Sequence, residues 1–194
     1  MKNHGSAEFR RGIALDSRGM RGMFDPVAGT RLAPGQGMHP FPHHYAVHAR
    51  ATLEDDVMLR TPGVAPLRTT TPVEFGGRGD LWSPETLFVA AIADCFILTF
   101  RAVAAASRMP WISIECDASG TLDRVERVTQ FTGCHLHARL RVPAGSDEAQ
   151  ARRLLEKAET SCLVTNSLKC ATTLHAQVEI VAEGEPAAAW HQVD

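Results

Sequence analysis

One segment of the chain is apolar around most of a helix. Residues 83–85 are Ser-Pro-Glu, which favours a helix start. Serine caps N-termini, proline fits the first turn, and glutamate suits the positive end of the helix dipole. The apolar positions of residues 87–100 predict a helix that continues to about Ser107. One chain of this size can hardly bury such a helix on every side, so we expect a second copy to cover part of it.

Shorter segments alternate between apolar and polar residues, which is the period of a β-strand. The pattern predicts strands in residues 45–50, 57–60, 67–73, 112–116, 120–125, 129–132, 135–142 and 172–181. In residues 135–142, histidine and arginine occupy one face while leucine, alanine and valine occupy the other. One wet face and one core face are typical of an antiparallel sheet.

A second helix is predicted after the strands. Ser146 is a suitable N-cap for a helix that runs to about Thr160. Its apolar stripe consists of Ala151, Leu154, Leu155 and Ala158. Two helices placed among grouped strands predict the α+β class rather than alternating βαβ units.

Residues 1–43 differ from the rest of the chain. They are rich in glycine, proline and arginine and have few periodic apolar positions. Such a segment buries little apolar surface. We therefore expect a flexible or loosely docked N-terminal extension, followed by one folded domain in residues 44–194.

Composition excludes several classes of protein. The 194 residues are 44% hydrophobic and 22% charged, which is ordinary for a globular domain and excludes bulk disorder. A net charge of −2 gives no reason to expect a nucleic-acid partner. No apolar run reaches the ~18 residues of a membrane span, and the first 25 residues show no apolar core of a secretory signal. We expect no membrane partner and a cytoplasmic location.

The cysteines offer the most informative candidate chemistry. There are five, Cys95, Cys116, Cys134, Cys162 and Cys170, with no Cys-x-x-Cys spacing. This odd number favours reduced or redox-active thiols over a secreted disulfide scaffold. Cys95 lies midway along the apolar helix and Cys162 follows the second helix. From position alone, each is equally explained as a small buried apolar residue.

Other candidate sites are weaker. Cys134 points to the opposite side of its strand from His135 and His137, so these three are not expected to bind zinc. The glycines of residues 76–79 lack the pattern of a phosphate-binding loop and indicate a turn. Ser83 has no nucleophile elbow around it and is interpreted as a helix cap.

Four segments together resemble the OsmC/Ohr family, the osmotically inducible protein C and organic hydroperoxide resistance proteins. They are residues 72–77 (PVEFGG), 82–87 (WSPETL), 91–96 (AIADCF) and 158–168, which contain Cys162. The likeness extends over residues 45–181. It implies an OsmC-like fold, in which antiparallel sheets wrap long central helices in an intertwined homodimer. That expectation agrees with the helix that is apolar on most sides.

The resemblance also implies a thiol-dependent peroxidase. By motif position, Cys95 attacks the O–O bond of an organic hydroperoxide and becomes a sulfenic acid. Cys162 then condenses with it to a Cys95–Cys162 disulfide. An external dithiol reductant, such as a lipoylated protein, restores both thiols. No metal and no bound cofactor are expected.

Peroxide is attacked by a thiolate, so the pKa of Cys95 has to be lowered. Burial alone raises a thiol pKa, so we expect a nearby cation. The resemblance implies an arginine held by Glu85. The family's two branches place this arginine at positions where this chain has Phe75 and residues 54–56.

Four other arginines could substitute for the missing family arginine: Arg50, Arg60, Arg68 and Arg78. We prefer Arg78. Glu85 and Cys95 are ten residues apart, which is about 15 Å along a straight helix. The predicted site therefore needs a kinked helix or residues from both chains.

Two further departures from the family keep other functions open. Asp94 adds a negative charge beside Cys95, and Leu163 stands where a proline commonly follows the second cysteine. One alternative is a catalytically weak member that binds a small apolar ligand in the dimer groove. Another is a protein that senses peroxide through its thiols.

Overall fold

The structure is a computed structural model that describes residues 40–182. The chain divides into two units, residues 1–45 and residues 46–194. All helices and strands that the structure describes belong to the second unit. The predicted extension of residues 1–43 falls almost entirely outside the described residues.

The first elements form a small antiparallel sheet in the order β1-β2-β3. These strands are β1 (His48–Arg50), β2 (Val57–Arg60) and β3 (Leu67–Thr69). The predicted third strand is too long at its end. Pro72 has no N–H to donate to a neighbouring strand, and the chain there turns into the short 3₁₀ helix η1 (Val73–Phe75).

The larger sheet is built on a long hairpin of β4 (Ser113–Val125) and β5 (Val128–Pro143). The two turn residues, Glu126 and Arg127, both have positive φ, as a two-residue hairpin turn requires. The four short strands predicted here are two continuous ones, with a shift in register between Thr121 and Leu122.

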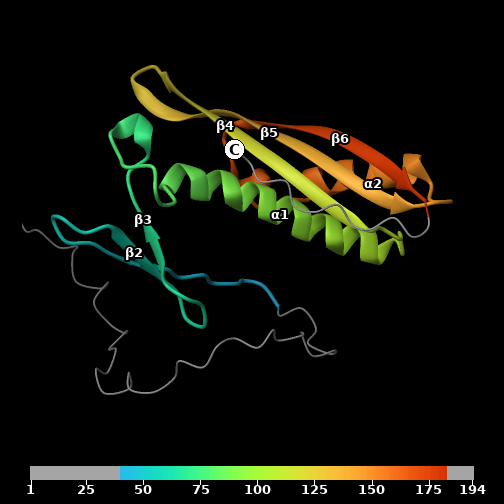
Figure 1. Cartoon of the computed structure of the whole chain (residues 1–194), viewed down its shortest axis with the longest axis horizontal. Helices are drawn as coiled ribbons and strands as arrows, with labels where there is room; N and C mark the ends of the chain where they lie inside the picture. Colours follow the sequence, from blue (N-terminus) through green and yellow to red (C-terminus); the bar gives the residue numbers. More distant parts are fainter. Residues whose placement is uncertain (1–39, 183–194) are drawn as a thin grey trace, which may run out of the picture. The chain divides into compact units, whose positions relative to one another are not determined.

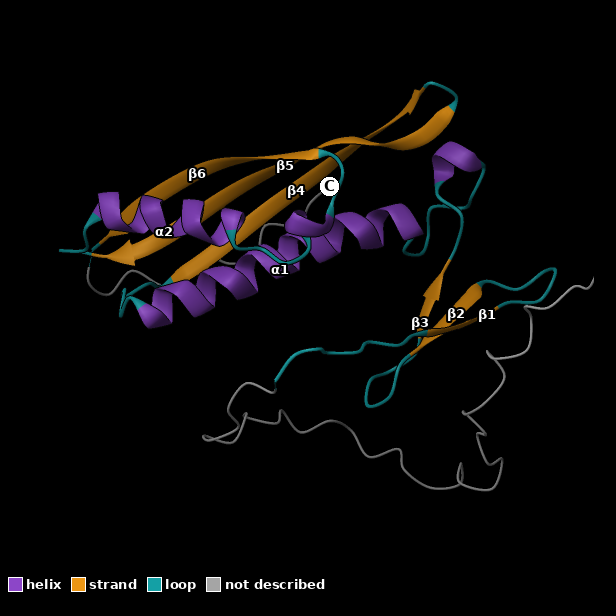
Figure 2. Cartoon of the chain, turned by 180° about the vertical axis from the view of Figure 1, so that it is seen from behind, coloured by secondary structure: helices purple, strands orange, loops and turns teal. Residues whose placement is uncertain are grey.

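β6 (Ala171–Val181) completes this sheet in the order β4-β5-β6 and pairs with β5 in parallel. The prediction of antiparallel sheets is therefore right for β1-β2-β3 and for β4–β5, and wrong for β5–β6. Helix α2 (Glu148–Thr160) is the reason, because it crosses over the sheet and returns the chain to run in the same direction as β5. Figures 1 and 2 show α1 (Pro84–Ala106) and α2 on the same face of this sheet.

The helix starts follow from their capping residues. Ser83 and Thr86 form a reciprocal capping box at the start of α1, with Pro84 in the first helical position. This confirms the predicted helix. At α2 the cap is Asp147, whose carboxylate accepts a hydrogen bond from the Gln150 N–H at 3.0 Å. The prediction of Ser146 is wrong by one residue, and an aspartate is as good a cap as a serine.

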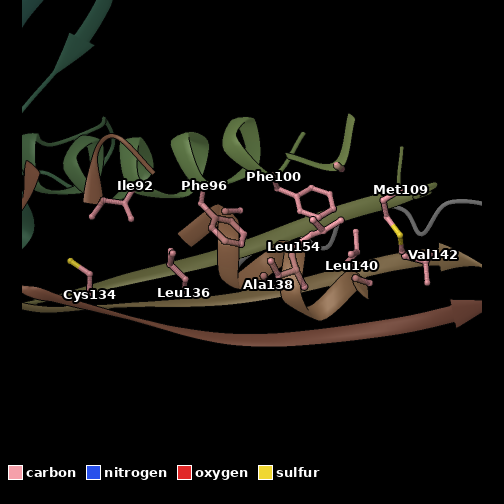
Figure 3. Packing of buried hydrophobic residues seen from close by; sticks show 14 residues of the cluster. Ile92, Phe96, Phe100, Met109, Cys134, Leu136, Ala138, Leu140, Val142 and Leu154 are labelled. Atoms are coloured by element: carbon pink, nitrogen blue, oxygen red, sulfur yellow. The ribbon is translucent and has the colours of Figure 1, made fainter. Parts of the chain in front are cut away.

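The core lies between the two helices and the larger sheet. Ile92, Phe96 and Phe100 of α1 point at the inner residues of β5, among them Leu136 and Leu140 (Figure 3). The predicted apolar stripe of α2 is buried against the same layer. All four of its residues are buried: Ala151, Leu154, Leu155 and Ala158.

One chain leaves much of α1 uncovered. Leu98 is 51% exposed on the side away from the core. By length and composition α1 is apolar enough to cross a membrane, and only 22% of its most apolar 18-residue window is buried. Within one chain, then, α1 has a buried stripe and a second apolar side open to its surroundings.

The core argument predicts the effect of a truncation. Phe96 is fully buried, so Phe96→Ala should lower the free energy of unfolding by about 3–5 kcal/mol, through lost burial and the cavity left behind. Chemical denaturation measures it. Phe75→Ala is the control, because Phe75 is 57% exposed and its truncation should cost far less. Equal midpoints for the two variants would contradict this account of the core.

Candidate active site

The structure brings Cys95 and Cys162 together. Cys95 lies in the middle of α1 and is half-buried, while Cys162 follows α2 and is fully buried. Each side chain is close enough to the other to shift its pKa, Cys162 lowering that of Cys95 and Cys95 raising that of Cys162. Both are free thiols. Residues from two distant parts of the chain thus form one dithiol.

Cys162 is held by the α2–β6 loop, which we define as residues 161–170. Its N–H donates to the Glu159 carbonyl at 3.1 Å, and its own carbonyl accepts from the Asn166 N–H at 3.1 Å. The Thr165 hydroxyl also donates to that carbonyl, at 3.2 Å. These bonds turn the chain after Thr160 and hold Cys162 in place.

The pKa of Cys95 lies below that of an ordinary thiol. Burial acts to raise it, but hydrogen bonds to the sulfur outweigh burial. In decreasing order, the donors are the Cys162 side chain and the backbone N–H groups of Val164 and Leu163, with a smaller contribution from Thr99. Hydrogen bonds to the charged form of a group favour that form. These donors therefore favour the thiolate form of Cys95.

Three other cysteines are shifted the opposite way. Burial raises the pKa of Cys162. Burial, with a smaller effect of Asp117, raises the pKa of Cys116 to about 12. Burial and the adjacent Cys170 raise the pKa of Cys134 to about 11. Hence Cys95 has the character of a nucleophile, and Cys162 that of a partner which keeps its proton.

The sequence argument expected a nearby cation to lower the pKa of Cys95. Among the described residues, the groups that lower it are neutral donors, two of them backbone N–H groups. Such groups can stabilise a thiolate as a cation does, since their dipoles point at the sulfur. An arginine is thus not required for the shift that the described residues produce.

This assignment predicts the pH dependence of alkylation. With iodoacetamide and mass spectrometry, Cys95 should react half-maximally below the ordinary thiol value of ~8.5, and Cys116 only at strongly alkaline pH. Leu163→Pro removes one N–H donor, so it should move the Cys95 profile to higher pH. Leu163→Ala keeps the N–H and is the control. Wild-type Cys95 titrating above ~8.5 would contradict the role of these donors.

Arg78 and Glu85 lie apart within the chain that the structure describes. The Arg78 guanidinium contacts Asp56 at 3.0 Å and Asp80 at 3.2 Å. Asp56 also pairs with Arg68. The Glu85 Oε2 atom is buried and has no hydrogen-bond partner among the described residues.

Glu85 and Cys95 are not brought together either. Helix α1 is continuous from Pro84 to Ala106, so ten residues separate Glu85 from Cys95 by about 15 Å along its axis. One chain thus presents the predicted site in two places. The dithiol lies midway along α1, and the carboxylate lies at the helix start.

Glu85 faces a cavity of about 460 Å³. Its walls are mainly apolar and come from the start of α1, the η1 region and the β4–β5 hairpin; they include Phe75, Val89, Leu122 and Phe131. Gly120 is also part of the wall, and a Cβ there would lie 2.8 Å from the Phe131 ring. Neither Gly120 nor Phe131 belongs to a recognised motif, so sequence reasoning did not point to either residue.

Sequence comparisons relate this chain to known proteins. Residues 77–177 match the family of OsmC-like proteins. An organic hydroperoxide resistance protein from Xanthomonas axonopodis pv. citri is 30% identical over 130 residues, which cover 64% of this chain and 87% of that protein. YmaD, an uncharacterised protein of Bacillus subtilis, is 24% identical over 149 residues, 74% of this chain and 98% of that protein.

Solved structures show the same fold. A crystal structure of an organic hydroperoxide resistance protein OsmC from Legionella pneumophila has a TM-score of 0.56 and 26% identity, and the match covers 70% of this chain and 97% of that one. An OsmC-like protein from Vibrio cholerae has a TM-score of 0.60 at 19% identity, covering 71% of this chain and all of that one.

Proposed function

Because this chain belongs to the OsmC-like protein family, we propose that it is a thiol-dependent peroxidase that reduces organic hydroperoxides. The observation that carries the proposal is that the Cys95 and Cys162 side chains lie together, with the pKa of Cys95 lowered and the pKa of Cys162 raised. A thiolate beside a protonated thiol is the arrangement that a two-cysteine peroxidase needs.

In the proposed reaction, the Cys95 thiolate attacks one oxygen of the hydroperoxide and the O–O bond breaks. The other oxygen leaves as an alkoxide, which takes up a proton and departs as the alcohol. Cys95 is now a sulfenic acid. The Cys162 sulfur attacks the Cys95 sulfur, the hydroxyl leaves as water, and a disulfide forms. An external dithiol then reduces this disulfide by exchange and becomes oxidised itself.

The apolar cavity supports an organic substrate in this proposal. Its aromatic and aliphatic walls suit the hydrocarbon group of an organic hydroperoxide, a group that hydrogen peroxide lacks. Since Glu85 and Cys95 lie about 15 Å apart along α1, we propose that a homodimer completes the site. The apolar side of α1 pairs with its copy, and the partner subunit's Glu85 approaches Cys95.

Arg78 remains our candidate for the guanidinium that Glu85 holds. For that role the Arg78 side chain, which is 58% exposed, has to leave its ion pair with Asp56 and pair with Glu85 instead. Arg78→Ala should then slow peroxide reduction more than Arg68→Ala does, although Arg68 pairs with the same Asp56. Equal rates for the two variants would remove Arg78 from the proposed site.

The cavity also favours one alternative, a protein that binds a small apolar ligand without turnover. Free thiols titrated before and after one equivalent of cumene hydroperoxide distinguish the two functions. The peroxidase should lose two thiols per chain, and Cys95→Ser should prevent the loss. An unchanged thiol count would favour the ligand-binding function.

Removal of the second thiol should separate two steps of the cycle. Cys162→Ser should still reduce about one equivalent of hydroperoxide per chain, because Cys95 can reach the sulfenic acid. Multiple turnover with a dithiol should fall strongly, since no resolving thiol lies beside Cys95 in this variant. A stopped-flow experiment measures the single turnover, and a steady-state assay measures the multiple turnover with a dithiol. If steady-state turnover survives, Cys162 is not the resolving thiol.

A further inference from the structure

A second pair of thiols lies outside the site described above. The Sγ atoms of Cys134 and Cys170 are 3.8 Å apart. Cys134 is 1% exposed on β5, and Cys170 is half-buried just before β6. Neither has a part in the proposed peroxidase cycle.

The sheet register explains why these two cysteines meet. Parallel pairing of β5 and β6 begins with Gly133 opposite Ala171 and Cys134 opposite Thr172. Cys170 therefore lies one residue before the ladder, in a bend of the α2–β6 loop. Cys134 faces the core layer, where Leu136 follows it on the same side of β5. Because Cys170 lies in this bend, its backbone is not held by the strand-pairing hydrogen bonds that hold the residues of β6.

We infer that Cys134 and Cys170 form a second redox-active pair, which closes reversibly into a disulfide by exchange with a low-molecular-weight disulfide. A disulfide bond is about 2.05 Å long, so the two sulfurs have to approach each other from 3.8 Å. Movement of the bend at Cys170 supplies this approach. The inference does not depend on the proposed peroxidase function.

The exchange has two steps. The Cys170 thiolate, on the more accessible residue, attacks one sulfur of the external disulfide and releases one thiolate, which takes up a proton. Cys134 then loses its proton and attacks the Cys170 sulfur of the mixed disulfide, which releases the second thiol. Two protein thiols are oxidised, and one external disulfide is reduced to two thiols.

Closure has a structural consequence for the neighbouring site. Cys170 ends the α2–β6 loop, and the same loop carries Cys162 with the Leu163 and Val164 amides that donate to Cys95. Hydrogen bonds inside the loop, such as Ser167 Oγ to the Leu163 carbonyl at 2.8 Å, make it a continuous unit. A Cys134–Cys170 disulfide therefore ties the loop that bears Cys162 to β5.

The test uses the full chain with Cys95→Ala and Cys162→Ala, so that only Cys116, Cys134 and Cys170 remain. This protein is incubated with glutathione disulfide, and free thiols are trapped with N-ethylmaleimide. We expect two fewer adducts per chain and a cross-linked peptide containing Cys134 and Cys170. Excess dithiothreitol should reverse both. A non-reducing gel should keep the chain at its own mass of 21.1 kDa.

Matched variants in the same background assign the bond. Cys116→Ser should leave the cross-link intact, and Cys170→Ser, at a half-buried position, should abolish it. Oxidation should raise the melting temperature by on the order of 5–10 °C, because the bond closes a long loop, and Cys170→Ser should remove this rise. Absence of the cross-link in excess glutathione disulfide would overturn the inference, as would a bond to Cys116 or between two chains.

Discussion

Replacement of Cys95 by serine is expected to lower the peroxidase rate by on the order of 10³-fold or more, the scale on which loss of a catalytic nucleophile acts. A serine hydroxyl is not ionised at neutral pH, and the Cys162 side chain and the Leu163 and Val164 amides, which stabilise a thiolate, cannot make it a comparable nucleophile. Consumption of cumene hydroperoxide in the presence of a dithiol measures the rate.

Cys116→Ser is the matched control for this experiment. Cys116 is half-buried like Cys95, but burial raises its pKa to about 12, so it contributes no thiolate near neutral pH. Its replacement should change the rate by less than about twofold. Activity that persists in Cys95→Ser, or that is lost in Cys116→Ser, would assign the chemistry to a different thiol.

Leu98→Glu is expected to break the proposed dimer and to remove activity with it. Leu98 is 51% exposed in one chain, on the side of α1 that we propose to pair with its copy. A two-fold axis places the substitution on both sides of the interface. Each copy then loses apolar burial of about 1.5–3 kcal/mol and gains a charge that is costly to bury.

Light scattering distinguishes the outcomes. Wild-type protein should have twice the chain mass of 21.1 kDa, and Leu98→Glu should give a single-chain mass or an unfolded protein. Val128→Glu is the control, because Val128 is 57% exposed beside the tip of the β4–β5 hairpin and lies off α1. A stable wild-type monomer would contradict the dimer.

The helices could be predicted from the sequence because a long apolar segment, an apolar stripe at helical spacing and a capping residue are all local signals. Strand pairing is not local. The parallel pairing of β5 with β6 depends on where α2 returns the chain. The alternating pattern of residues 171–181 predicts a strand but does not indicate the direction in which it pairs. The long hairpin appeared as four short strands because small and polar residues such as Asp117, Ser119 and Gly133 resemble breaks between strands, although all three are paired within the hairpin.

The site was predictable only in part. Cys95 and Cys162 are far apart in sequence, and the resemblance rather than any spacing suggested that they act together. The donors to Cys95 could not be predicted, because nearly every residue has a backbone N–H and residue type does not indicate where it points. Leu163 illustrates this: the sequence presents it as a departure from the family, whereas its amide is one of those donors. The roles of Glu85 and Arg78 stay predictions.

The central claim is that Cys95 and Cys162 form one redox couple that hydroperoxide oxidises. Non-reducing peptide mapping after one equivalent of cumene hydroperoxide tests it most directly. We predict a disulfide between the peptide containing Cys95 and the peptide containing Cys162 as the main product, with Cys116 still free. Sulfonic acid accumulating on an unlinked Cys95, or a main disulfide that omits Cys95 or Cys162, would contradict the claim.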